Sequence, residues 1–91
     1  MNEIKKDKNK FYIGENSKNA LAEITFVPDG EGKIIVDHTY VSNSLRGEGI
    51  AMQLVEKVIE YARTENKKIV PACSYVHKVM TNKDEYKDIL E

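Results

Sequence analysis

A chain of 91 residues, 41% of them hydrophobic and 32% charged, has the composition of one small globular domain and not of a disordered segment. Its 14 basic and 15 acidic side chains give a formal net charge of −1, which excludes the concentrated basic surface of a general nucleic-acid-binding protein. No apolar run is long enough to cross a membrane, and the N-terminus lacks the apolar core of a signal peptide. We therefore expect one domain over residues 1–91, in the cytoplasm, without a membrane or nucleic-acid partner.

Few side chains in this chain can bind a metal. It has a single cysteine, Cys73, and two histidines, His38 and His77. One cysteine cannot form an intramolecular disulfide, and its spacing from the histidines is not that of a metal site. We expect no structural metal.

The first half of the chain predicts antiparallel strands. One or two short strands are expected within residues 1–14, and residues 20–27 alternate enough to form a half-buried strand. Residues 33–41, rich in Ile, Val and Thr, predict the next strand. The segment 28–32, Pro-Asp-Gly-Glu-Gly, is a strong turn signal, so the two longer strands should form a hairpin.

From about Glu48 to Asn66 the apolar period changes from two to about 3.6, which indicates an amphipathic helix. One stripe holds its apolar side chains: Ile50, Ala51, Leu54, Val55, Val58, Ile59 and Ala62. Asn66 is a suitable end because asparagine tolerates the left-handed conformation of a helix cap.

After this helix, residues 68–73 predict a short strand in which Pro71 marks an edge, a bulge or the end of pairing. A short helix around residues 75–80 and a last turn ending at Leu90 follow. The long helix is a crossover connection, so the strands on either side of it should be parallel or splayed neighbours. The order of elements predicts an α+β fold with a helix layer on a twisted, mostly antiparallel sheet.

The segment 41–51, Val-Ser-Asn-Ser-Leu-Arg-Gly-Glu-Gly-Ile-Ala, is a polar turn that runs straight into the long helix. Gly47 and Gly49 allow positive φ and a close approach of the backbone to a ligand. The first N–H groups of a helix have no intrahelical acceptor, and the helix dipole favours an anion beside them. The segment predicts a phosphate site to which Arg46 adds charge. The alternative is a plain strand-to-helix turn with a solvated Arg46.

The segment 46–51, Arg-Gly-Glu-Gly-Ile-Ala, fits the (Gln/Arg)-x-x-Gly-x-(Gly/Ala) loop of the GNAT superfamily of acyl-CoA-dependent N-acetyltransferases, and the chain resembles this family over roughly residues 20–86. The resemblance implies that the loop amides hold the pyrophosphate of acetyl-CoA or coenzyme A, and that the preceding strand pairs with the pantetheine arm. The coenzyme-binding residues that it implies are Val41, Arg46, Gly47, Glu48, Gly49, Ile50 and Ala51. The chain departs from the family at Asn43, where many members carry proline, and it has almost no room for the two early helices that wall the acceptor site.

A closer similarity is to a compact GNAT-like subgroup in which the segment 70–76, Val-Pro-Ala-Cys-Ser-Tyr-Val, and a late Glu85-Tyr86 recur. In that subgroup a cysteine lies beside the acyl group, with a histidine from the strand before the loop as its proposed neighbour. Cys73 and His38 are the matching residues. The acetyl group would then pass through Cys73 in two steps or go directly to an amine.

Cys73 stands at the end of a predicted strand and just before a helix, where a helix dipole gives a thiol thiolate character. The alternative is a small buried hydrophobic residue, the usual role of a free cysteine. Tyr75 and Tyr86 are candidates for a general acid, or are packing residues.

Histidine has a reference pKa of about 6.5, which suits a group that takes a proton from an incoming ammonium or from a thiol. Strand alternation predicts His38 and Tyr40 on one face, and Asp37, Thr39 and Val41 on the other. Asp37 is the rival base.

Three functions remain open at this point. The leading one is an acetyltransferase with an amine acceptor on a small molecule or a protein. The second is a non-catalytic module that binds coenzyme A or acyl-CoA as a sensor or interaction domain. The third is an interaction protein linked to toxins or stress, in which the loop is only structural. The sequence does not determine the acceptor, the acyl length or the oligomeric state.

Overall fold

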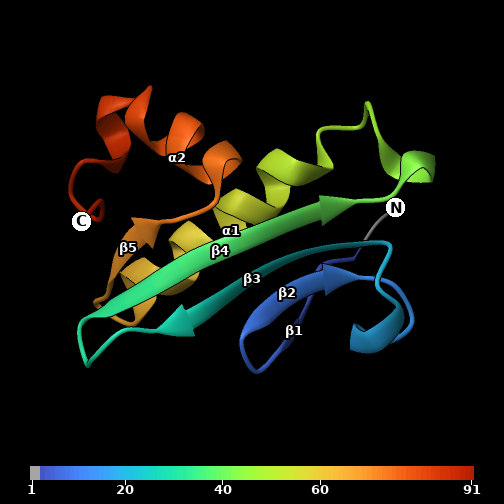
Figure 1. Cartoon of the computed structure of the whole chain (residues 1–91), viewed down its shortest axis with the longest axis horizontal. Helices are drawn as coiled ribbons and strands as arrows, with labels where there is room; N and C mark the ends of the chain where they lie inside the picture. The colour runs from blue at the N-terminus through green and yellow to red at the C-terminus, as the bar shows by residue number, and fades with distance from the viewer. Residues whose placement is uncertain (1–2) are drawn as a thin grey trace.

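The computed structural model describes residues 3–91, in which five strands form one sheet in the order β1-β2-β3-β4-β5 (Figure 1). Neighbouring strands are antiparallel except β4 and β5, which are parallel. The strands are β1 (Lys5–Asp7), β2 (Lys10–Ile13), β3 (Ala22–Pro28), β4 (Lys33–Val41) and β5 (Lys68–Pro71). The predicted α+β fold, with its hairpin and its parallel neighbours around a crossover helix, is confirmed.

Two α-helices follow the main hairpin: α1 (Ile50–Thr64) and α2 (Ser74–Thr81). The structure also has three single turns of 3₁₀ helix, η1 (Ser17–Asn19), η2 (Asn43–Leu45) and η3 (Asp84–Tyr86). The first two were not predicted, because a single turn inside a loop has no hydrophobic period to reveal it.

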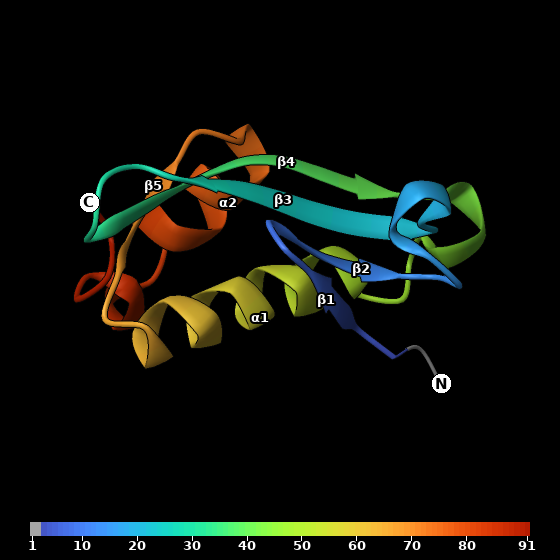
Figure 2. The same cartoon turned by 90° about the horizontal axis from the view of Figure 1, so that it is seen from below.

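Helix α1 covers one face of the sheet (Figure 2). Six of the seven side chains in its predicted stripe are buried, and Ala51 is half-buried. The helix begins after Gly49, whose φ is 73°, and the chain leaves it through Asn66, whose φ is 57°. Asparagine is one of the few residues besides glycine that adopts this conformation readily, which explains why the helix ends there.

The opposite face of the sheet has no helix over it in residues 3–91 (Figure 2). Val27 and Tyr40, which point to this face, are 40% and 44% exposed. Helix α2 lies at the β5 edge instead, where Val76 and Met80 are buried in the same core as α1. The sheet therefore has one packed face and one open face. None of the helices in residues 3–91 is long and apolar enough to cross a membrane.

Removal of the Leu54 side chain tests the packing of α1 on the sheet. Leu54 is fully buried, so Leu54→Ala should lower the free energy of unfolding by about 2–5 kcal/mol through lost burial and a residual cavity. Glu60→Ala, at an exposed position of the same helix, should change it by less than about 0.5 kcal/mol. Urea denaturation followed by circular dichroism measures both, and equal effects would contradict this packing.

Candidate active site

The loop before α1 brings backbone donors to the surface. Gly47 and Gly49 have φ of 86° and 73°, and a Cβ on either would project into open space. Glycine at the start of α1 supplies no side-chain cap, and the N–H groups of Ile50, Ala51 and Met52 have no acceptor within the helix. This end of the helix can therefore donate to an anion, as the sequence predicted.

Two buried side chains hold the ends of this loop. Leu45 and Ile50 are 9% and 3% exposed and belong to the main core. Arg46 is exposed, and its Nε donates to the carbonyl oxygen of Val41 over 3.3 Å. The loop is thereby tied to the core and to the end of β4.

Strands β4 and β5 separate halfway along β4. Their pairing extends from Lys33 opposite Lys68 to Val36 opposite Pro71. Proline has no N–H for the ladder, and the next two N–H groups, of Ala72 and Cys73, both donate to the carbonyl oxygen of Val36 over 3.0 Å. The chain then turns into α2, so within residues 3–91 the second half of β4 has no strand beside it on this side. Of the alternatives predicted for Pro71, the structure has the end of pairing, on the edge strand β5.

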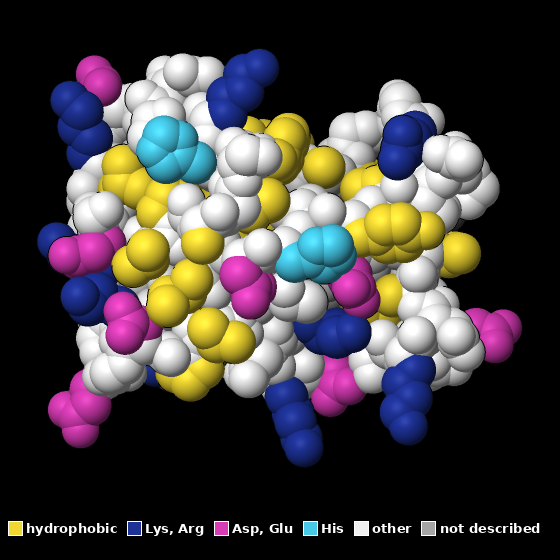
Figure 3. Space-filling view, viewed as in Figure 1, with side chains coloured by type: hydrophobic (Ala, Val, Ile, Leu, Met, Phe, Trp, Pro, Cys, Tyr) yellow, Lys and Arg dark blue, Asp and Glu magenta, His cyan; other side chains and the backbone are white. Residues whose placement is uncertain are grey.

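An open cavity of about 230 Å³ lies where β4, the loop and α2 come together. In the space-filling view this region is a hollow at the upper edge of the molecule, with hydrophobic side chains exposed in it (Figure 3). The lining residues are Val41, Leu45, Arg46, Gly47, Gly49, Ile50, Ala51, Met52 and Tyr75. The structure thus brings the predicted coenzyme-binding residues, except Glu48, together with the first turn of α2 around one cavity.

A β-bulge in β4 determines which residues face this region. Thr25 on β3 pairs with His38, but Phe26 pairs with Val36, so Asp37 is an extra residue. The Oγ1 of Thr25 donates to Asp37 Oδ1 over 2.6 Å. The predicted alternation was therefore wrong for Asp37, which lies beside Thr25 on the open side of the sheet and not beside Thr39.

Beyond the bulge, Thr39 pairs with the buried Ile24 and faces the α1 side of the sheet. Its Oγ1 lies 3.5 Å from Cys73 Sγ. Cys73 is half-buried against the core and precedes the first residue of α2. Sequence reasoning correctly placed Thr39 on the face opposite His38 but missed it as a neighbour of the thiol, because strand alternation does not show which face of β4 Cys73 approaches.

The environment of Cys73 favours its thiolate. Burial raises the pKa of the thiol, but hydrogen bonds from the Thr39 hydroxyl and from the backbone of Val76, Tyr75 and Thr39 lower it more, so the net pKa is lowered. Two of these groups belong to the first turn of α2, where the helix dipole acts in the same direction. This direction agrees with the thiolate character expected of Cys73.

His38 lies on the open face of the sheet. Its side chain is 56% exposed, and its Nε2 lies 3.7 Å from Glu23 Oε2, an ion pair when the imidazole is protonated. Lys10 Nζ donates to the other oxygen of Glu23 over 2.9 Å. Among the contacts of residues 3–91, none joins His38 to Cys73, so the structure places the two candidate catalytic residues on different sides of β4.

The remaining aromatic and histidine candidates occupy three different environments. Tyr75 is 37% exposed and lines the cavity, whereas Tyr86 is 5% exposed and belongs to the core. His77 is exposed on α2. Within the described part of the chain, no group of three or more His, Cys, Asp and Glu side chains comes together as a metal site.

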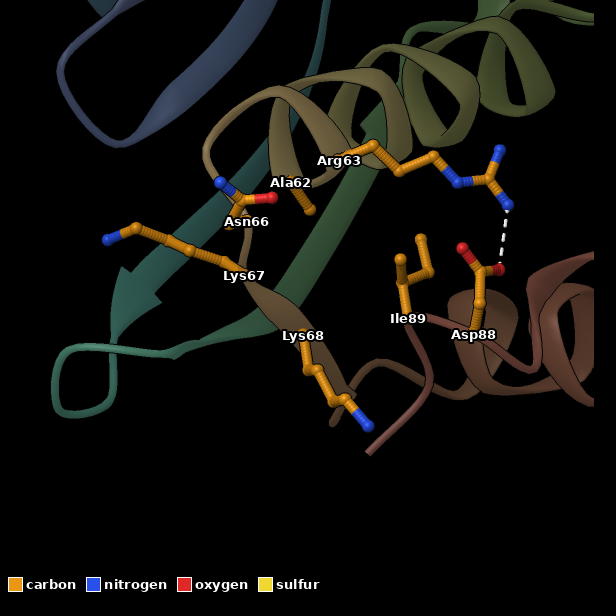
Figure 4. A pocket seen from close by; sticks show the side chains of 7 residues that line it. All are labelled: Ala62, Arg63, Asn66, Lys67, Lys68, Asp88 and Ile89. Atoms are coloured by element: carbon orange, nitrogen blue, oxygen red, sulfur yellow. Dashed lines mark hydrogen bonds and ion pairs between the residues drawn. The ribbon is translucent and has the colours of Figure 1, made fainter.

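A second cavity, of about 270 Å³, lies at the C-terminal end of α1 (Figure 4). An Arg63 nitrogen donates to Asp88 Oδ1 over 2.9 Å there, beside Lys67 and Lys68. The hydrogen bond to the Arg63 guanidinium lowers the pKa of the Asp88 carboxyl. None of the predicted site residues lines this cavity, which joins α1 to the C-terminal turn.

A comparison with family models decides the relationship. The model described as GCN5-related N-acetyl-transferase matches residues 10–89. The chain belongs to the GCN5-related N-acetyltransferase family. The search of curated proteins found no match to this chain.

Solved structures agree with this assignment. The solution structure of a GCN5-like protein from Staphylococcus aureus shares 43% identity with this chain, with a TM-score of 0.81, over 98% of this chain and 87% of the other. Two larger proteins share the fold. A GNAT-family acetyltransferase from S. aureus is 17% identical to this chain, with a TM-score of 0.59. The match covers 80% of this chain and 49% of the acetyltransferase. A Mycobacterium tuberculosis protein solved in complex with CoA is 12% identical to this chain, with a TM-score of 0.54. The match covers 89% of this chain and 66% of the M. tuberculosis protein.

The lowered pKa of Cys73 has a direct test. The rate of alkylation by iodoacetamide rises with pH as the thiol ionises, and its midpoint in the folded protein should lie below that of the unfolded chain. The same chain unfolded in urea is the control, because Cys73 is its only thiol. A folded-state midpoint at or above that of the unfolded chain would contradict the assigned environment.

Proposed function

We propose that this protein is an acetyl-CoA-dependent acyltransferase that acetylates an amine on a small molecule or a protein. One observation carries the proposal: a single cavity connects the uncapped start of α1 with the start of α2, beside the half of β4 that β5 leaves unpaired. An anion finds backbone donors at one end of this cavity, and Tyr75 at the other end is two residues after Cys73, whose thiol has a lowered pKa. Membership of the family and the CoA complex of the M. tuberculosis protein support the same ligand.

In this proposal the loop holds the pyrophosphate of the coenzyme through its backbone. A charge-assisted hydrogen bond to phosphate contributes about 1.5–3 kcal/mol, so the N–H groups of the first turn of α1, which lack acceptors within the helix, suffice as an anchor. Arg46 adds a solvent-exposed charge, and its share is small. Val41, at the end of β4, leads the coenzyme from the loop toward Cys73. The holding residues are Val41, Arg46, Gly47, Glu48, Gly49, Ile50 and Ala51.

Cys73 is the proposed acceptor of the acetyl group. Its thiolate attacks the carbonyl carbon of acetyl-CoA, and the new carbon–sulfur bond forms as the bond to the coenzyme sulfur breaks. The departing coenzyme thiolate takes a proton from water. An amine then attacks the acetyl group on Cys73, the carbon–sulfur bond breaks, and the Cys73 thiolate is restored.

His38 is the proposed base for the amine and not for the thiol. It lies on the open face, where no helix of residues 3–91 prevents the approach of an acceptor, and its Nε2 is 3.7 Å from Glu23 Oε2. Since His38 and Cys73 lie on different sides of β4, the incoming ammonium gives its proton to His38 on the open face before the amine attacks the acetyl group. An uncovered face admits a side chain or terminus of a protein as readily as a metabolite.

A second candidate is a module that binds coenzyme A or acyl-CoA without turnover. The separation of His38 from Cys73 is the observation that favours it. The two candidates share the coenzyme site and differ only in chemistry. A third possibility, a loop with no ligand, predicts no coenzyme binding at all.

A pair of glycine variants tests the coenzyme site. Gly49→Glu places bulk and negative charge against the pyrophosphate and should abolish binding of coenzyme A and acetyl-CoA in isothermal titration. Gly30→Glu is the matched control, because Gly30 has the same φ of 73° and the same open space around a Cβ, but lies in the β3–β4 turn. Both should lose about 1–2 kcal/mol of stability to the strained φ. Unchanged affinity in Gly49→Glu would exclude this loop as the site.

The two half-reactions separate the roles of Cys73 and His38. Intact mass after incubation with acetyl-CoA should show one acetyl group on the wild type and none on Cys73→Ala. His38→Ala should acquire the acetyl group normally but pass it to an amine about 10²–10⁴-fold more slowly. Amine acetylation by Cys73→Ala at the wild-type rate would mean direct transfer, and no turnover with any of a panel of amines and peptides would favour the binding module.

A further inference from the structure

We infer that Thr39 is a positioning residue for Cys73, which holds the sulfur at the fork between β4 and β5 and donates a hydrogen bond to its thiolate. This inference rests on the proposed function, since it concerns the residue that receives the acetyl group. Sequence reasoning assigned Thr39 no role.

The side chains of Thr39 and Cys73 are in contact. Thr39 Oγ1 lies 3.5 Å from Cys73 Sγ, a hydrogen-bonding distance for sulfur, and both side chains are half-buried. The Cys73 N–H is fixed to the carbonyl oxygen of Val36, which stands three residues before Thr39 on the same strand. One strand therefore fixes both the backbone and the side chain of Cys73, at the point where β5 leaves it.

The bulge in β4 selects Thr39 for this contact. In an uninterrupted β4, the residue two positions after the buried Val36 would be His38, and it would share the face of Val36. The extra residue Asp37 shifts this alternation by one, so His38 pairs with Thr25 on the open face and Thr39 faces the thiol. The Thr25–Asp37 hydrogen bond of 2.6 Å stabilises the bulge in this arrangement.

The Thr39 hydroxyl binds the thiolate of Cys73 more strongly than its thiol. A hydroxyl beside a thiol can accept from it, but beside a thiolate it can only donate, so the bond is stronger with the ionised form. After burial, which raises the pKa of Cys73, the Thr39 hydroxyl is the largest of the influences, and it lowers that pKa. In the proposed reaction the thiolate is present twice, as the attacking group and again as the leaving group when the amine takes the acetyl. A better stabilised thiolate leaves faster, so the same bond serves the second step.

Thr39→Val tests this role, because it removes the hydroxyl and keeps the branched shape that suits a strand. The midpoint of Cys73 alkylation against pH should rise by about one unit, a tenfold loss of thiolate at any pH well below it. Acetylation of Cys73 by acetyl-CoA should slow by roughly 3–10-fold, because the lost thiolate is partly offset by its higher nucleophilicity. Thr39→Ser retains the hydroxyl and should restore both quantities.

Thr64→Val, at an exposed position at the end of α1, is the matched control and should leave the midpoint unchanged. Thr39→Ala supplies a second variant without the hydroxyl, should valine perturb the fold seen by circular dichroism. A wild-type midpoint in both Thr39→Val and Thr39→Ala would overturn the inference. So would a raised midpoint in Thr39→Ser equal to that of Thr39→Val.

The alkylation measurement needs no coenzyme, so its outcome for Thr39 does not depend on whether the proposed function is correct. An unchanged midpoint in Thr39→Val, with an acetyl adduct on wild-type Cys73, overturns the role of Thr39 and leaves the acyltransferase intact. A raised midpoint without any adduct on the wild type supports the positioning of the thiol by Thr39 and overturns the covalent role of Cys73.

Discussion

The end of the β4–β5 pairing is the constraint on which the candidate site depends. Pro71 cannot donate to the ladder, and one oxygen, that of Val36, accepts from both Ala72 and Cys73. Two strands that continued side by side would close the gap and leave no room for a ligand. Because they separate here, β4 keeps an unpaired half, Cys73 stands at the fork, and α2 begins close to the loop.

A rigid core surrounds this open region and keeps it in place. Leu45 before the loop and Ile50 after it are both buried, so the glycine-containing segment between them is short and anchored at both ends. On the other side, Val76 fastens the first turns of α2 to the same core. The loop amides and the thiol are thus held by one set of packed side chains, which suits a site that must present both to a single ligand.

Hydrophobic period, turn residues and one loop motif predicted most of this structure. The strand at residues 33–41 was predicted with the bounds that the structure has, and Asn66 ends α1 in the left-handed conformation expected of it. The bulge at Asp37 was not predictable, because an inserted residue in a ladder is determined by pairing with β3 and leaves no mark on composition. Strand alternation correctly placed His38 and Thr39 on opposite faces, and it was the family resemblance that suggested His38 as the neighbour of the thiol where the structure has Thr39.

The same bulge gives β4 two chemically distinct sides. The α1 side has the cavity, the thiol and a hydroxyl that favours its ionised form, and the open side has an imidazole paired with a carboxylate. In the proposed reaction this separation matches the order of events, since a thiolate attacks a thioester in the first step and an amine must lose a proton in the second. A base on the open face is available to an acceptor before it reaches the acetylated cysteine, because no helix of residues 3–91 covers that face.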